Sequence, residues 1–236
     1  MNNIESPLLL NARLNMLAVF DLDSLPEEVM QHIPLDASAL KDYKQLLVFG
    51  HGGKDMWQAV QQSSFSSESD PIDSFSIDVV QNYFKQEQAD CSYHLLYPSP
   101  IRNIPLQALG KLAGWHHDSP FRIGINAEYG SWFAYRVVVL ADTSLKPTKT
   151  MDAPSPCLSC ADKPCIPVCP ANALQTGDLS FQKCMDYRLQ HDSVCKSKCI
   201  SRLACPVAKE HRYSSEQVAY HYNISMQTIE QYQKTS

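Results

Sequence analysis

The sequence predicts an α+β protein of two domains, an α/β sandwich over residues 1–150 and a small cysteine-rich module after it. In the first 150 residues, short apolar runs of strand type are mixed with amphipathic segments of helix type. Eight of the nine cysteines lie between Cys157 and Cys205. The chain has 236 residues, of which 44% are hydrophobic. A chain of this size can bury one sizeable core and still carry a small second module.

Two segments of the first domain have the pattern of buried strands. Residues 45–53 (QLLVFGHGG) are apolar and end in glycines, and residues 136–142 (RVVVLAD) are β-branched between turn formers. Residues 76–88 and 105–115 space their apolar side chains three or four apart, which predicts two helices. Strands and helices mixed in one compact unit favour an α/β or α+β sandwich. The serine-rich, acidic residues 61–73 predict a surface loop.

The domain boundary is expected near residue 150. Residues 143–156 are rich in Thr, Lys, Ser and Pro and have no periodic apolar pattern, which is typical of a linker. The second domain is predicted to span residues 151–212. Residues 213–236 are predicted to form a helical tail that packs on the N-terminal domain, begun by a capping box from Ser214 to Gln217.

Composition limits the cellular setting and the chemistry. The net charge of -5 argues neither for nor against nucleic acid or an anionic membrane. The first residues lack the features of a secretory signal, and no apolar run is long enough to span a bilayer, so we expect a cytoplasmic protein without a membrane partner. Because reducing compartments keep structural thiols unpaired, the cysteines indicate metal or cluster ligation rather than disulfides.

The cysteines form two runs of four, and each run ends in Cys-Pro. The first run is Cys157-x2-Cys160-x4-Cys165-x3-Cys169-Pro170, and the second is Cys184-x10-Cys195-x3-Cys199-x5-Cys205-Pro206. In two-cluster ferredoxins, the Cys-Pro cysteine of one run ligates the cluster of the other run. The runs therefore predict two [4Fe-4S] clusters held by two crossed sets. The first set is Cys157, Cys160, Cys165 and Cys205, and the second set is Cys169, Cys184, Cys195 and Cys199.

Two other interpretations of the cysteines stay open. Structural zinc sites built from four cysteines also use short C-x2-C pairs, but the interleaved runs and the Cys-Pro endings favour clusters. Buried thiols without a ligand role are disfavoured, because these cysteines lie among Lys, Ser, Asp and Pro. Cys91, which lies outside the runs, is predicted to be an ordinary thiol.

The second run is locally basic. From Lys183 to Arg212, seven Lys and Arg face three Asp and Glu, a local charge of +4. This charge could offset the negative charge of thiolate-ligated clusters, or attract an acidic, low-potential electron donor such as a flavodoxin or ferredoxin, or a phosphate-bearing substrate. A solvated basic face is the alternative.

Three blocks, in this order, resemble a known family. IPLQALGKLAGW, EYGSWFAYRVVVLAD and the two cysteine runs resemble epoxyqueuosine reductases and the related cobalamin-dependent reductive dehalogenases. YGSWFAYRVVVL and RYSSEQVAY also resemble cobalamin-processing decyanase proteins. The resemblance implies a nitroreductase-like cobalamin domain before a two-cluster ferredoxin-like module, with the same crossed ligation. It also implies cobalamin as a cofactor, near a corrinoid pocket at Gly130, Ser131, Trp132, Phe133 and Tyr135. Alternating aromatics that enter a strand are also typical of a core.

Two stretches depart from the reductases. They carry an acidic residue, thought to donate a proton, in a short Asp-Ser/Thr-x-Pro stretch, whereas residues 97–100 here are Tyr-Pro-Ser-Pro. Their Gly-Trp-x-Gly-Lys is replaced at residues 114–118 by Gly-Trp-His-His-Asp. His116 and His117 could protonate a substrate, although a polar turn at a helix end is the simpler interpretation. With the C-terminal helical repeats of the reductases also expected to be missing, tRNA is not expected as a partner.

The sequence thus predicts an iron-sulfur redox protein. Two clusters would deliver single electrons to a pocket in the N-terminal domain. The expected activity is that of a corrinoid-dependent reductase, and the expected substrate is a corrinoid or another small molecule. Two alternatives stay open: a non-catalytic ferredoxin-type electron carrier, and a protein that reduces or handles cobalamin without acting on another substrate.

Overall fold

The chain divides into two compact units. The computed structural model describes residues 4–33, 37–99, 104–149, 153–175 and 179–235. Unit 1 consists of Met1–Gly114 and Phe133–Asp152, and unit 2 of Trp115–Trp132 and Ala153–Ser236. The boundary predicted near residue 150 lies outside the described residues. Residues 115–132 group with the cysteine-rich unit, whereas the sequence placed them in the first domain.

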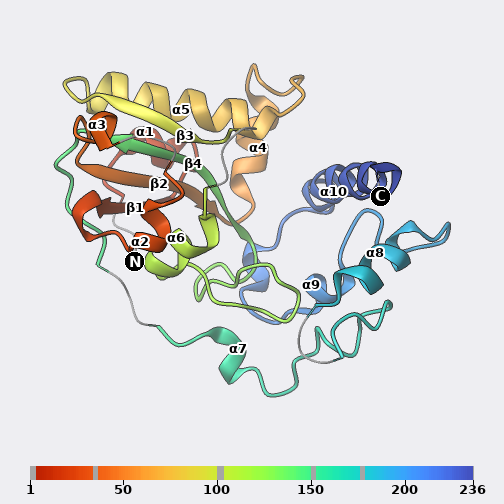
Figure 1. Cartoon of the computed structure of the whole chain (residues 1–236). Helices are drawn as coiled ribbons and strands as arrows, with labels where there is room; N and C mark the ends of the chain where they lie inside the picture. The colour runs from red at the N-terminus through yellow and green to blue at the C-terminus, as the bar shows by residue number, and fades with distance from the viewer. Residues whose placement is uncertain (1–3, 34–36, 100–103, 150–152, 176–178, 236) are drawn as a thin grey trace. The chain divides into compact units, whose positions relative to one another are not determined.

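Unit 1 is built on an antiparallel sheet of four strands in the order β1-β2-β4-β3 (Figure 1). The strands are β1 (Met16–Asp21), β2 (Gln45–Gly52), β3 (Tyr93–Tyr97) and β4 (Phe133–Ala141). The central strands β2 and β4 are almost wholly buried, which explains why their sequences are continuous apolar runs. The strands predicted at residues 45–53 and 136–142 are therefore confirmed, whereas β1 and β3 were not predicted.

The helices of unit 1 include both of those predicted. They are α1 (Pro7–Asn11), η1 (Leu22–Ser24), α2 (Glu27–Met30), α3 (Ala37–Leu40), α4 (Asp55–Gln62), α5 (Pro71–Glu87) and α6 (Leu106–Leu112). The helix predicted at residues 76–88 corresponds to α5, which is longer because it begins earlier, at Pro71. Proline suits the first helical turn, where its missing N–H has no partner to lose. The last residues of the predicted loop 61–73 therefore belong to α5.

Helices cover both faces of this sheet. Tyr135 and Arg136 are successive residues of β4, so their side chains point to opposite faces. On one face, a Cβ on Gly110 of α6 would overlap the Tyr135 hydroxyl, so only glycine fits there. On the other face, burial raises the pKa of Asp73 of α5, and the charge of Arg136 opposes that rise. Unit 1 is a mixed α/β unit with helices on the two sides of a small antiparallel sheet.

Unit 2 consists of short helices joined by turns. Its elements are α7 (Pro156–Ser159), α8 (Phe181–Leu189), α9 (Ile200–Ala204), η2 (Lys209–His211) and α10 (Ser215–Thr235). The predicted start of the tail helix is confirmed, since the Gln217 amide donates to Ser214 Oγ at 3.1 Å. Helix α10 groups with unit 2 and contacts α8, and the predicted packing of residues 213–236 on the N-terminal domain stays a prediction. Within the described ranges, no helix combines the length and the apolar character needed to cross a membrane.

Tyr83 of α5 makes unit 1 sensitive to alkaline pH. Its side chain is buried, and burial raises its pKa to about 12. An unfolded tyrosine ionises near pH 10. The unfolded chain therefore loses this proton first, so the stability that Tyr83 contributes is complete below about pH 10 and is lost as the pH rises toward 12. In Tyr83→Phe, the free energy of unfolding by urea should fall less steeply between pH 10 and 12 than in the wild type. Tyr232→Phe, at an exposed position, is the control, and equal slopes for Tyr83→Phe and the wild type would contradict the prediction.

Candidate functional site

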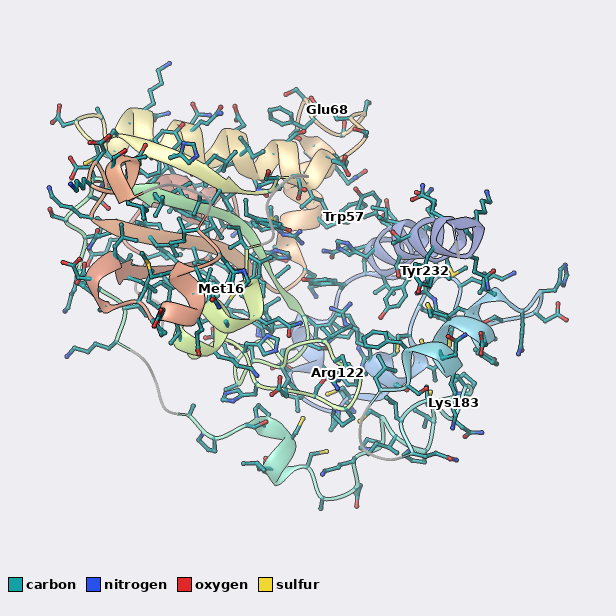
Figure 2. All side chains as sticks on the ribbon, in the orientation of Figure 1. Met16, Trp57, Glu68, Arg122, Lys183 and Tyr232 are labelled. Carbon is teal, nitrogen blue, oxygen red and sulfur yellow. The ribbon has the colours of Figure 1, made fainter. Side chains whose placement is uncertain are left out.

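The eight clustered cysteines lie on turns and short helices of unit 2. Cys157 follows the first residue of α7, whose start is capped by Ser155, and Cys184 lies in α8, whose start is capped by Ser180. Cys199 precedes α9, and its Sγ accepts a hydrogen bond from the Arg202 amide at 3.4 Å. Figure 2 shows the side chains of this unit, with Lys183 marking α8 and Arg122 marking the segment 115–132. Short elements with many turns let thiols distant in sequence approach one another.

The first predicted set comes together around a small apolar cluster. Cys165 and Cys205 are buried with Phe121, Ile125 and Leu174, and Cys157 packs against this cluster. The pKa of Cys165 is raised to about 11, first by burial and then by three neighbouring thiols, those of Cys205, Cys157 and Cys160. The pKa of Cys157 is raised by burial and then by Cys205. Cys205, from the second run, is thus a neighbour of three cysteines of the first run.

The second predicted set lines one cavity of about 460 Å³. All four of its members face this cavity: Cys169, Cys184, Cys195 and Cys199. The pKa of Cys184 is raised to about 11, first by burial and then by Cys199, Cys169 and Cys195. Cys169, from the first run, is thus a neighbour of three cysteines of the second run. Each Cys-Pro cysteine therefore lies beside cysteines of the other run.

The thiols of each set are donors that a [4Fe-4S] cluster can use. Among the residues that the structure describes, no three His, Cys, Asp or Glu side chains converge closely enough to hold one metal ion. A tetrahedral zinc site needs four ligands within about 2.3 Å of one point. A cubane instead takes one thiolate at each of four separate iron corners, so four thiols spread around a cavity are a suitable donor set. Ligation by these cysteines stays a prediction.

Cys91 belongs to unit 1, whereas both sets belong to unit 2. Its thiol is half-buried and donates to Gln88 Oε1 at 3.8 Å. The prediction that Cys91 is an ordinary thiol stays a prediction.

The segment that the resemblance assigned to a corrinoid pocket spans both units. In unit 2, the side chains of Ser131 and Trp132 are wholly buried. Gly130 has φ +60°, and a Cβ there would lie 2.6 Å from the Val207 carbonyl, so glycine is needed for this close approach. In unit 1, Phe133 is buried, and its ring meets that of Tyr135 edge to face at 5.8 Å. A corrin role for these five residues stays a prediction.

Arg202 fixes Ser131 and Trp132 in unit 2. The guanidinium donates from Nη2 to the Ser131 carbonyl at 2.5 Å and from Nε to Ser131 Oγ at 3.4 Å. It lies 4.3 Å from the centre of the Trp132 ring and 5.3 Å from that of Tyr213, close enough for cation–π attraction. This role of Arg202 was not predicted from the sequence, where Arg202 contributes only to the basic excess over residues 183–212.

The two histidines of residues 114–118 lie in unit 2. His116 is buried, its Nε2 lies 3.6 Å from Asp118 Oδ1, and its ring fills the space that a Cβ on Gly124 would need. His117 exchanges backbone hydrogen bonds with Ile125. These contacts agree with a structured turn. A proton-donating role for either histidine stays a hypothesis.

Comparison with known proteins identifies the fold. No protein-family model matches the chain, and no curated protein matches it. Among solved structures, an epoxyqueuosine reductase with an epoxyqueuosine-modified tRNA stem loop is similar at 15% identity and a TM-score of 0.53, over 90% of this chain and 67% of that one. The chain has the fold of epoxyqueuosine reductases. It covers 66% of the length of the Bacillus subtilis epoxyqueuosine reductase.

Two other kinds of protein share the epoxyqueuosine reductase fold with this chain. The B12-trafficking protein CblC of C. elegans is 18% identical with a TM-score of 0.53, over 88% of this chain and 85% of that one. The catabolic reductive dehalogenase NpRdhA, in complex with 3-bromo-4-hydroxybenzoic acid, is 14% identical with a TM-score of 0.53, over 92% of this chain and 32% of that one. The resemblance inferred from the sequence is therefore confirmed at the level of the fold.

Proposed function

We propose that this chain is an iron-sulfur redox protein that holds two [4Fe-4S] clusters and delivers single electrons to a pocket in its N-terminal domain. One observation carries the proposal: the cysteines are neighbours in the crossed sets that two-cluster ferredoxins use. Cys205 neighbours the first run, and Cys169 shares a cavity with the second.

The cysteines would hold the clusters, and the surrounding residues would set their environment. When bound, a [4Fe-4S] cluster supplies one-electron transfer. The apolar cluster of Phe121, Ile125 and Leu174 excludes water beside the first set. The Arg202 amide donates to Cys199 Sγ in the second set. Hydrogen bonds to sulfur and exclusion of solvent are two of the factors that determine a cluster's potential.

We propose a corrinoid as the electron acceptor. The support is the fold, which the chain shares with a B12-trafficking protein and with a dehalogenase whose structure suggests a mechanism for B12-dependent dehalogenation. The candidate residues remain Gly130, Ser131, Trp132, Phe133 and Tyr135.

An acidic, low-potential protein such as a flavodoxin or ferredoxin is the proposed donor, because residues 183–212 carry a charge of +4. We do not propose tRNA as a substrate. Residues 97–100 are Tyr-Pro-Ser-Pro and lack the acidic residue that the epoxyqueuosine reductases carry in the similar stretch.

Anaerobic purification followed by iron, sulfide and zinc analysis tests the clusters. We expect about eight irons and eight sulfides per chain, with a visible spectrum that bleaches on reduction by dithionite. Stoichiometric zinc without iron would refute the cluster proposal. The corrinoid is tested separately, by titrating the same preparation with cob(II)alamin. A saturable change in the cobalamin spectrum is expected, and its absence would remove the corrinoid while leaving the clusters in place.

A cobalamin-handling protein is the second candidate function. It is favoured by one observation: the chain shares its fold with the B12-trafficking protein CblC, at a TM-score of 0.53. Turnover separates the two candidates. A handling protein should bind and reduce cobalamin stoichiometrically, whereas a reductase should consume many equivalents of donor in the presence of a halogenated or epoxide substrate. A ferredoxin-type carrier should do neither, while exchanging electrons with a redox protein.

A further inference from the structure

Arg188 is a buried cation at the centre of unit 2. It lies in the last turn of α8 and is only 6% exposed. Its guanidinium donates from Nε to the Cys195 carbonyl at 3.1 Å and from Nη1 to Ser225 Oγ at 2.8 Å. From Nη2 it donates to the carbonyls of Tyr222 at 3.0 Å and Lys196 at 3.3 Å. One side chain thus joins α8, the second cysteine run and α10.

The hydrogen bonds of Arg188 leave its charge without a counter-charge. All four acceptors are neutral, and among the described residues no carboxylate pairs with this guanidinium. A buried charge is costly unless an opposite charge lies near it. The ionisable groups on which Arg188 acts are two thiols of the second set, Cys184 and Cys195, whose pKa values it lowers against the larger effect of burial. Arg188 also lines the cavity that these cysteines share.

The first set has cations near it too, but each of them is more exposed than Arg188. Lys163 acts on Cys157, and Lys209 and Arg212 act on Cys205. Both lysines are exposed, and Arg212 is half-buried. Water and salt screen exposed charges strongly and buried ones much less. Hydrogen bonds to sulfur occur in both sets: Val207 donates to Cys205, Arg202 to Cys199 and Ile200 to Cys195. The second set differs from the first in having Arg188, a buried cation that solvent screens little, beside its cavity.

We infer that Arg188 is a positioning residue that raises the reduction potential of the second cluster above that of the first, so that an arriving electron settles on the second set. The inference rests on the proposed function. Reduction adds one electron, and one unit of negative charge, to a centre already anionic from four thiolates, and net charge is one of the factors that set cluster potentials. A nearby buried positive charge stabilises the reduced form more than the oxidised form. The electron comes from the low-potential donor, which is oxidised by one electron.

The order of reduction in the wild type is the first measurement. The intact protein is titrated anaerobically with dithionite while electron paramagnetic resonance and visible spectra are recorded. Cys205→Ala, which should lack the first cluster, identifies which signal belongs to the second. We expect the second cluster to be reduced first, and reduction of the first cluster before it would overturn the inference. A wild-type protein without iron would overturn the proposed function and this inference together.

Three variants then test Arg188 itself. Arg188→Gln removes the charge, Arg188→Lys keeps it, and Lys183→Gln removes an exposed charge from the same helix (Figure 2). At a fixed ambient potential, Arg188→Gln should change the oxidised-to-reduced ratio of the second cluster at least tenfold toward oxidised, which corresponds to about 59 mV for one electron. The ratio for the first cluster should change less than twofold. Arg188→Lys should retain most of the wild-type ratio, and Lys183→Gln should alter either ratio less than twofold.

The variants also separate an electrostatic role from a merely structural one. If Arg188 only braces α8 against α10, Arg188→Gln should lower the melting temperature and leave the ratio of the second cluster unchanged, which would overturn the inference. Equal changes at both clusters would overturn it as well. If Arg188→Gln fails to fold, Arg188→Lys and the wild-type order of reduction decide the matter.

Discussion

Cys205→Ala should lose about half of the bound iron and sulfide, and it should lose them from the cluster of the first run. Cys205 lies in the second run, yet it is buried with Cys165 and raises the pKa of that thiol. Alanine cannot ligate iron, so the remaining three thiols of the first set would hold an incomplete cluster. Iron and sulfide analysis, together with the electron paramagnetic resonance spectrum of the reduced protein, measures the loss.

Comparison of three single variants decides whether the ligation is crossed. If it is, Cys205→Ala and Cys157→Ala should lose the same spectroscopic signal, and Cys169→Ala should lose the other one. If each run instead holds its own cluster, Cys157→Ala and Cys169→Ala should lose the same signal. Cys91→Ala is the matched control, since its thiol lies in unit 1 beside Gln88, and it should keep the full iron content.

The proximity of these cysteines could be predicted because few physical roles compete for a cysteine in such a pattern. Spacing and the two Cys-Pro endings are local, and the crossed assignment follows from them without knowledge of the fold. The cations beside the thiols could not be found in the same way. Arg188 and Arg202 are both buried, but in the sequence they contribute only to a basic excess that a solvated face would also produce. Burial of an arginine depends on which segments fold over it.

The fold shows a similar division. Strands β2 and β4 were predicted because they lie in the middle of the sheet, where both faces are covered and the sequence is apolar without interruption. Strands β1 and β3 lie at its edges. The residues of β3 (YHLLY) are mostly half-buried, and a short run of that kind does not distinguish a strand from a helix turn. Their place is determined by pairing with β2 and β4.

The grouping of residues 115–132 with unit 2 is also a tertiary effect. This segment lies between a predicted helix and a predicted strand, so continuity along the chain favours the first domain. Its apolar side chains instead pack against the cysteine-rich region: Phe121 and Ile125 are buried with Cys165 and Cys205. The first set and the apolar side chains around it therefore come from three stretches of sequence, one of which contains no cysteine. The spacing of cysteines carries no information about that third stretch.

Arg202→Ala should lower the free energy of unfolding of the protein, purified anaerobically, by about 3 kcal/mol, as measured by urea titration. The guanidinium is 7% exposed and donates to the Ser131 carbonyl at 2.5 Å. Its removal leaves a buried carbonyl without that donor and takes the cation from the Trp132 ring, 4.3 Å away. Hydrogen bonds from charged groups contribute about 1.5–3 kcal/mol, and a desolvated cation–π contact about 2 kcal/mol. Losses below 1 kcal/mol would contradict this account.

Two further variants divide the effect of Arg202 into its parts. Arg202→Lys keeps a cation near Trp132 but loses the planar fork, so its loss should be intermediate. Ser131→Ala removes only the hydroxyl, which is 3.4 Å from Arg202 Nε, and should cost little. The amide of residue 202 still donates to Cys199 Sγ in every variant, so the iron content should not change. Lower stability with unchanged iron content would mean that Arg202 holds Ser131 and Trp132 in place without being part of the ligand set. A loss of iron in Arg202→Lys would instead assign Arg202 a direct role in cluster binding.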